Sequence, residues 1–402
     1  MAPRQEPGGS LPRSKSSQKS FSSDYNENGT IKTMNNGRDV TRIRECENGI
    51  KLYTLEPTSF SNWPKWLRKF AGWVLLLYFV FLFLVIPLSL VFLHPWFWGT
   101  ATRSTCSTLY LTSLVIAAVI PLREWPAIRP LAQLWYELFD VSINLSPDER
   151  REMVERANSN GKHTITAMHP HGIVPFHGLL WASASEQYLQ IQEPGQPVKW
   201  MYGFAAAASA VFRIPLLRNL LGWFATHGAS YHTLRDGLLH GKCVPTNNIG
   251  RIPQHLYLLP GGVAEVFVST VGRQAIVFKE RRGICKLAIE CNSEITPIYI
   301  FGVTDIFYNL AAGDSWLSKF SRKWKLGLTY FWGHFGLPIP FTPRMTIIVG
   351  KSLPLPKGWS GRGEIPERLI DEYHAAYLRE ITNIFDKYKA AAGYPDAQLE
   401  VF

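Results

Sequence analysis

The segment TITAMHPHG, residues 164–172, decides the fold, because a short apolar run in it ends at two closely spaced histidines. The apolar run is predicted to form a buried strand, and His169-Pro170-His171-Gly172 the turn that follows it. In an α/β domain, such turns present the polar side chains of a site. Pro170 holds the residue before it in extended backbone, where side chains two positions apart point to the same side. His169 and His171 are therefore expected to face one site.

The chain on both sides of this segment alternates between short apolar runs and helical patterns. A capping box formed by Ser146 and Glu149 predicts the start of one helix. Asn292 suits the left-handed residue that ends a helix over residues 281–292, and a last helix is expected at about 366–392. The alternation predicts one α/β domain over residues 123–402. Strands are expected at residues 164–168, 198–204, 256–259, 296–302 and 345–350.

The residues before this domain are predicted to form a disordered tail and a membrane hairpin. Residues 1–62 are rich in Ser and basic residues, and their few apolar side chains cannot offset the entropy of ordering the chain. Residues 63–122 hold two uncharged apolar runs, and tryptophans lie at both ends of the first. This pattern predicts a transmembrane or re-entrant hairpin. Basic residues flank its outer ends, so both ends are expected on the cytosolic side.

Three roles are open for the histidines of residues 169–172. They can be turn residues whose rings bond to backbone. They can also bind a metal ion, with His177 as an additional ligand, although a closed site needs more coordinating side chains. In the third role an imidazole acts as general base in acyl transfer to a hydroxyl group. This role is favoured, because two titratable groups share one face, and His177 is then expected to pack on the following helix.

A second strand and turn supports acyl transfer. Residues 256–267, LYLLPGGVAEVF, predict a strand, a turn at Gly261 and Gly262, and the start of a helix. Backbone N–H groups at such a turn can hold an oxyanion. Gly172, in the first turn, permits close approach of a ligand because it has no side chain. Glu265 is placed to orient an imidazole or to hold a substrate hydroxyl.

The composition indicates anionic partners. The chain has 42 Lys and Arg against 31 Asp and Glu, a net charge of +11, and its apolar and aromatic content favours lipid over nucleic acid. A basic cluster follows the second turn and suits the phosphates of coenzyme A, although a solvated charged surface is an equal alternative. The cluster consists of Lys279, Arg281, Arg282 and Lys286.

These motifs, in this order, resemble the type 2 diacylglycerol acyltransferase family, which includes monoacylglycerol acyltransferases and wax synthases. The resemblance covers residues 60–402. Its most specific part is the HPHG sequence of residues 169–172, followed by Gly261-Gly262 with Glu265. The block FKERRGICKLAIECNSEITPIYIFG, residues 278–302, also resembles the family pattern.

The resemblance implies a glycerolipid-acyltransferase-like fold, with a mixed sheet flanked by helices. It also implies transfer of a fatty acyl group from acyl-CoA to diacylglycerol, with His171 as general base and His169 or Glu265 orienting it. It implies an enzyme of the endoplasmic reticulum membrane that reaches lipid droplets, uses acyl-CoA as co-substrate, and needs no metal or further cofactor.

Other functions stay open. Monoacylglycerol and fatty alcohols are alternative acceptors within the same family. A membrane-anchored metal-dependent hydrolase and a non-enzymatic lipid-droplet scaffold are alternatives of other classes. Homo-oligomerisation is also left open.

Overall fold

The computed structural model describes residues 32–36, 39–88, 101–158, 163–191, 199–201, 203–240, 255–310 and 329–402. Its centre is a sheet of ten strands, all within this described part of the chain. In spatial order the strands are β1 (Lys32–Asn36), β2 (Asp39–Glu45), β3 (Lys51–Thr54), β4 (Ser142–Ile143), β15 (Thr346–Val349), β12 (Ser293–Phe301), β5 (His163–His169), β10 (His255–Leu258), β8 (Gly203–Ala207) and β9 (Thr226–Gly228).

The sheet is mixed, as the family resemblance implies. Each neighbouring pair from β12 through β5, β10 and β8 to β9 is parallel. β15 pairs antiparallel with β12, and β1 to β4 pair antiparallel with one another. The parallel strands therefore end at the same edge of the sheet, which brings the turns after β5 and β10 together.

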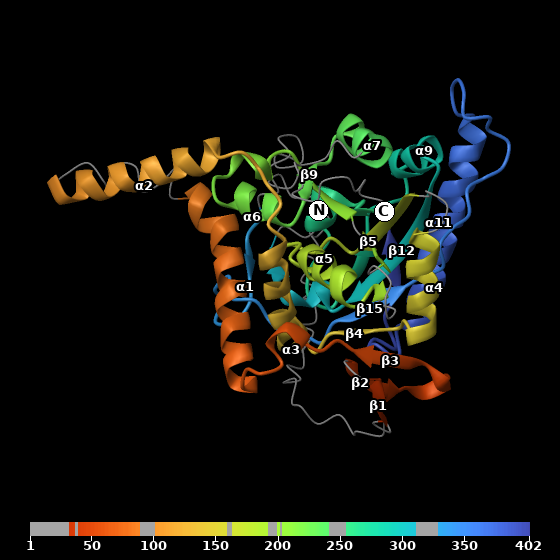
Figure 1. Ribbon diagram of the computed structural model, residues 1–402, viewed down its shortest axis with the longest axis horizontal. Helices are drawn as coiled ribbons and strands as arrows, with labels where there is room; N and C mark the ends of the chain where they lie inside the picture. The colour runs from red at the N-terminus through yellow and green to blue at the C-terminus, as the bar shows by residue number, and fades with distance from the viewer. Residues whose placement is uncertain are drawn as a thin grey trace, which may run out of the picture.

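Helices cover both faces of this sheet, and the apolar side chains of β5 pack on both sides of it. Ile165 and Ala167 pack into one core cluster, whereas Met168 points to the other. Figure 1 shows α9 and α11 beside one face of the sheet and α1 and α3 on the other side of the molecule. Two-sided burial of this kind is typical of parallel strands.

The helices have the following bounds: α1 Lys65–Leu88, α2 Ala101–Val119, α3 Leu134–Leu138, α4 Pro147–Asn158, α5 His177–Gln187, α6 Leu217–Trp223, α7 Tyr231–His240, α8 Gly262–Val266, α9 Gly283–Glu290 and α11 Glu367–Tyr388. Short strand pairs lie outside the main sheet: β6 (Gln190–Ile191) with β7 (Lys199–Trp200), β11 (Gln274–Ile276) with β16 (Leu399–Val401), and β13 (Tyr308–Asn309) with β14 (Phe331–Trp332).

The predicted helix ends are confirmed. The Ser146 N–H donates to Glu149 Oε2 at 2.8 Å, and the Glu149 N–H donates to Ser146 Oγ at 3.2 Å, which forms the capping box before α4. Asn292 follows α9 with a φ of 50°, as a residue that ends a helix in the left-handed region does. The final helix, α11, lies inside the predicted range 366–392.

The predicted transmembrane or re-entrant hairpin over residues 63–122 is wrong. Among the described residues, every helix is too short or too polar to traverse a bilayer. The apolar side chains of α1 instead pack partly on the domain: Leu76 and Phe79 are buried, and the Trp135 indole N–H donates to the Gly72 carbonyl at 3.2 Å. α2 is likewise joined to α6 through Arg218, which donates to the carbonyls of Ala117 and Ile120.

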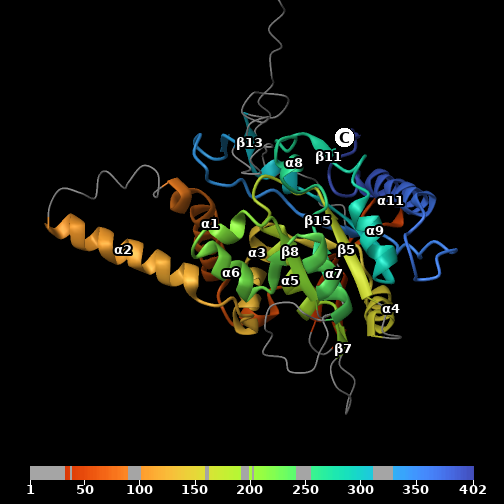
Figure 2. The same ribbon diagram turned by 90° about the horizontal axis from the view of Figure 1, so that it is seen from above.

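Figure 2 shows α1 lying along the body of the domain, with α2 extending away from it. The apolar run that resembles a membrane span in the sequence therefore has a partner surface within the chain itself. Residues 89–100, which belong to the predicted hairpin, lie outside the described residues.

The disordered tail predicted for residues 1–62 is wrong from β1 onward. β2 and β3 extend the main sheet, and β3 pairs with β4 through Tyr53 and Thr54. Leu52 and Leu55 are buried. This polar segment is ordered because it gains strand pairing and a few buried side chains from a distant part of the chain. Residues 1–31 lie outside the described residues.

Candidate active site

The two predicted turns meet at the edge where the parallel strands end. β5 ends at His169, and β10 ends two residues before Pro260-Gly261-Gly262. β10 pairs directly with β5, so the two turns are neighbours. The short helix α8 follows the second turn and carries Glu265.

Glu265 is the centre of this site. Its side chain is fully buried, and its carboxylate accepts hydrogen bonds from three separate parts of the chain. His169 Nδ1 and the Val277 N–H donate to Oε1 at 2.8 and 2.9 Å. The His171 N–H donates to Oε2 at 2.5 Å. One carboxylate therefore fixes the position of both histidines.

The same contacts decide the charge of Glu265. Burial by itself would raise the pKa of this carboxyl group. The neighbouring His169 and the hydrogen bonds from His169, Val277 and His171 outweigh burial, and the pKa is lowered. Glu265 is therefore ionised at neutral pH, and its negative charge is balanced by donors rather than by solvent.

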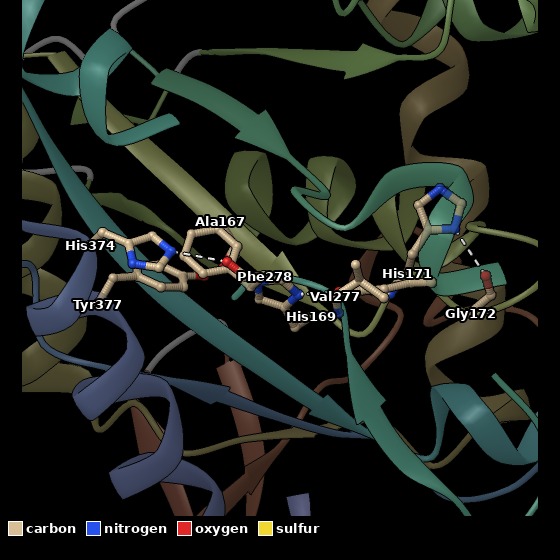
Figure 3. A network of polar contacts seen from close by, with 9 residues as sticks. Ala167, His169, His171, Gly172, Val277, Phe278, His374 and Tyr377 are labelled. Carbon is tan, nitrogen blue, oxygen red and sulfur yellow. Dashed lines mark hydrogen bonds and ion pairs between the residues drawn. The ribbon is translucent and has the colours of Figure 1, made fainter. Parts of the chain in front are cut away.

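His169 and His171 differ in burial and in the atoms through which they bond to Glu265. His169 is fully buried, and its ring makes edge contacts with Phe278 at 5.5 Å and Tyr377 at 6.0 Å between ring centroids. His171 is half-buried. Figure 3 shows His169 beside Phe278, with His171 farther along next to Gly172. Both side chains were expected to face one site. Both histidines do bond to Glu265, but His169 bonds through its ring and His171 through its backbone N–H.

The tautomer of His171 follows from its hydrogen bond. Nδ1 lies 2.9 Å from the Gly172 carbonyl oxygen, which only accepts, so Nδ1 carries the proton. Nε2 is then the nitrogen with a lone pair. Burial lowers the pKa of His171, outweighing the opposing effects of the Gly172 carbonyl and Glu265, so the ring is neutral at pH 7. A neutral imidazole with a free Nε2 is the form that a general base requires.

The three predicted glycines are needed for different reasons. A Cβ atom on Gly261 would lie 1.9 Å from Glu265 Cδ, so only glycine leaves space for the carboxylate. Gly172 has a φ of +66°, and a Cβ there would lie 2.7 Å from Val303 Cγ1. Gly262 faces open space, and its N–H already donates to the Leu259 carbonyl at 3.1 Å. The oxyanion role expected of these glycines stays a prediction.

The predicted basic cluster lies at the surface, outside the hydrogen-bond network of Glu265. Lys279, Arg281, Arg282 and Lys286 are all exposed. Arg282 forms an ion pair with Asp371, 2.5 Å between Nε and Oδ1. A surface cleft of about 620 Å³ lies here between the starts of α9 and α11, and its lining includes Arg282, Lys286, Glu364 and Glu367.

The sequence did not reveal the residues that hold Glu265 and Phe278, the two neighbours of His169, in place. Val277 contributes through its backbone, so no side-chain pattern marks it. His374 donates from Nε2 to the Phe278 carbonyl at 2.9 Å, and its ring stacks on Phe278 at an interplanar angle of 10°. The signal for His374 is present in the sequence, since it is a polar residue within the buried stripe of α11 that holds Tyr373 and Tyr377.

The described residues contain no group of three or more His, Cys, Asp or Glu side chains that could hold a metal ion. His177 begins α5, as expected of a residue on the helix after the HPHG turn, and it is fully buried.

Comparison with known proteins gives a family match over most of the chain. The family model described as Diacylglycerol acyltransferase matches residues 137–402, which include every candidate site residue. Diacylglycerol O-acyltransferase 1 of Eremothecium gossypii is 29% identical over 298 residues, 69% of this chain and 57% of that protein. Diacylglycerol O-acyltransferase 2 of Homo sapiens is 26% identical over 252 residues, 59% of this chain and 60% of that protein.

A third relative carries a different name. The 2-acylglycerol O-acyltransferase 3 of Homo sapiens is 26% identical over 254 residues, 60% of this chain and 69% of that protein. The chain thus spans less than two thirds of the length of the first two of these relatives. No solved structure matches it significantly.

Proposed function

The chain belongs to the diacylglycerol acyltransferase family, a family of acyltransferase enzymes, and we propose that it transfers a fatty acyl group from acyl-CoA to the free hydroxyl of diacylglycerol. The observation that carries this proposal is the hydrogen-bond network of Glu265. It holds the HPHG turn through the His171 N–H, while the His171 ring keeps Nε2 free of the proton.

His171 acts as the general base in this reaction. Its Nε2 takes the proton of the acceptor hydroxyl while the hydroxyl oxygen attacks the thioester carbonyl carbon. The tetrahedral intermediate then collapses, the carbon–sulfur bond breaks, and the thiolate of coenzyme A takes the proton from His171. Because the thioester is already activated, no covalent enzyme intermediate is needed. The buried charge of Glu265 stabilises the imidazolium formed between the two steps.

The proposed substrates rest on the exposed basic cluster and on the relatives of this chain. The exposed cluster of Lys279, Arg281, Arg282 and Lys286 supports binding of the phosphates of coenzyme A. Diacylglycerol is favoured as acceptor because two of the relatives compared carry it in their names, and 2-acylglycerol is the second candidate because a third carries that name. The two acceptors differ in the number of acyl chains on glycerol, so the choice between them depends on the surface that binds those chains.

We also propose that the enzyme works at the cytosolic surface of the endoplasmic reticulum membrane, from which an apolar acceptor can enter. Support comes from the outward face of α1, where Trp66 and Phe70 are 69% and 63% exposed, and from α2, where Leu109 is 66% exposed. Flotation of the purified enzyme with liposomes tests this, and an enzyme that stays unbound to neutral and anionic liposomes alike contradicts it.

An acceptor panel tests the reaction itself. The purified enzyme is incubated with radiolabelled oleoyl-CoA and diacylglycerol, 2-acylglycerol, fatty alcohol or no acceptor. We expect labelled triacylglycerol as the main product, reduced by about 100-fold to 10,000-fold in His171→Ala. Release of free fatty acid in every tube, with loss of activity on chelation, would indicate a metal-dependent hydrolase instead. Equal product from wild type and His171→Ala would contradict the assigned base.

A further inference from the structure

His177 is a buried histidine to which the mechanism above gives no role. Its side chain is fully buried at the first position of α5. Neither Nδ1 nor Nε2 has a hydrogen-bond partner in the described structure. A buried polar group without a partner destabilises the fold, and a leucine would fill an apolar position at lower cost. A bound ligand that reaches this imidazole would supply the missing polar partner.

The surroundings of His177 place it at the candidate active site. It lies six residues after His171, and four residues separate the helix that it begins from the HPHG turn. The neighbouring Gly178 approaches the second turn, because a Cβ atom there would lie 4.0 Å from Leu259 Cδ1. The start of α5 thus lies by the turns that carry His171 and Gly261.

The protonation state of His177 follows from this position. Burial and, to a smaller extent, the charge of His171 lower the pKa of His177 to about 3. The ring is therefore neutral throughout the physiological range, with one N–H donor and one acceptor nitrogen. It cannot take the substrate proton efficiently, but it can donate a hydrogen bond without changing charge.

We propose that His177 donates a hydrogen bond to the carbonyl oxygen of the acyl thioester and stabilises the oxyanion that forms there. The inference rests on the proposed acyl transfer, in which that oxygen gains negative charge when the acceptor hydroxyl attacks. Of the glycines expected to hold this oxyanion, Gly262 has its N–H already bonded to the Leu259 carbonyl. His177 would be a catalytic residue, since it touches the reacting group.

His255 provides a matched control. It is also fully buried, neither of its ring nitrogens has a partner in the described structure, and burial lowers its pKa to about 3 as well. It differs in place, because it begins β10 and lies beside Thr164 at the opposite end of the sheet. His177→Leu and His255→Leu therefore make the same chemical change in equally buried positions, and only one of these lies at the site.

The experiment compares kcat and KM of wild type, His177→Leu, His177→Gln and His255→Leu with oleoyl-CoA and diacylglycerol. We expect kcat to fall about 100-fold in His177→Leu, with a smaller change in KM, because the donor acts mainly in the transition state. His177→Gln keeps an N–H donor and should recover part of this loss. His255→Leu should keep kcat within about threefold of the wild type, since a solely structural change leaves the oxyanion untouched.

Thermal unfolding of each variant identifies any that do not fold. If His177→Leu does not fold, His177→Gln is compared with His177→Met, which has similar length and no N–H donor. Equal kcat in the variants with and without the donor overturns the role of His177. An inactive wild type overturns the proposed acyl transfer instead, so the two failures are distinguishable.

Discussion

Glu265 and the basic cluster around Arg282 are the two charged regions that the sequence singles out, and their environments are opposite. Glu265 is fully buried, and its carboxylate accepts hydrogen bonds from His169, His171 and Val277. The cluster of Lys279, Arg281, Arg282 and Lys286 is exposed throughout. The buried region is one connected hydrogen-bond network. In the surface region the cations are exposed to solvent, and Arg282 also pairs with Asp371.

The difference in burial determines which charged group is held in a fixed position. Around Glu265, three donors converge on one buried carboxylate, so a change in one contact affects the others. At the surface, water and salt screen each charge, and the ion pair of Arg282 with Asp371 is half exposed. The buried region therefore suits catalysis, and the surface region suits loose attraction of an anionic substrate.

The largest effect is expected from Glu265→Ala. The substitution leaves the buried His169 Nδ1 and the partly buried His171 and Val277 N–H groups without their acceptor. We expect a loss of about 3 to 5 kcal/mol in the free energy of unfolding, measured by denaturant titration, and loss of acyl transfer.

The matched control for Glu265→Ala is Asp371→Ala at the surface. It removes a carboxylate from a half-exposed ion pair, so the change in stability should stay within about 1 kcal/mol. If the two variants lose similar stability, the contrast between the buried and the exposed region does not hold.

A smaller effect is expected from Gly261→Ala. The new Cβ atom would lie 1.9 Å from Glu265 Cδ, so the carboxylate must move and release its donors. We expect kcat to fall about 100-fold, because a displacement of about 1 Å in a catalytic group has an effect of that size. Gly262→Ala is the comparison: its Cβ meets open space, and only its φ of +51° is unfavourable. Equal activity in the two variants would falsify the close approach of Gly261 to Glu265.

The pH dependence should follow His171. Burial lowers the pKa of this ring below its ordinary value of 6.5. In the proposed mechanism the neutral ring is the base. kcat/KM should therefore be flat near neutral pH and fall about tenfold per pH unit once the pH drops below the lowered pKa. Measurement of kcat/KM from pH 4.5 to 8 tests this, because the fall should lie at about pH 6.5 or below. A fall that begins above pH 6.5 would contradict a buried base.

The smallest effect is expected at the basic surface. Arg282→Ala and Lys286→Ala each remove one exposed charge, and each should raise the KM for acyl-CoA by about fivefold or less. The effect should diminish in high salt because exposed charges are screened, while kcat stays unchanged. Steady-state kinetics at low and high ionic strength measure it. A salt-independent loss of kcat in either variant would mean that this surface takes part in the chemistry.

Much of the fold and part of the site were predictable from the sequence. Strand and helix periodicity predicted the α/β domain, and the residues after two of its strands predicted the turns at 169–172 and at Gly261-Gly262. For Glu265 two alternatives were open, to orient an imidazole or to hold a substrate hydroxyl, and the sequence did not identify His169 as its partner. Val277 and Phe278 could not be predicted, because a backbone donor and an aromatic contact leave no local pattern. The helix of residues 65–88 was misassigned to the membrane because hydropathy does not identify the surface on which a helix packs.

By itself the sequence determined local structure: the strands that end at the two turns, the turns themselves, and that two histidines and one carboxylate lie in or next to those turns. Local periodicity is sufficient for this, because side-chain direction repeats within a single element. Only the tertiary structure decided that Glu265 bonds to His169 rather than to solvent, that the proton of the His171 ring lies on Nδ1, and that α1 packs on the domain. These outcomes depend on which segments distant in sequence become neighbours, and burial then fixes the charge and proton position of each group.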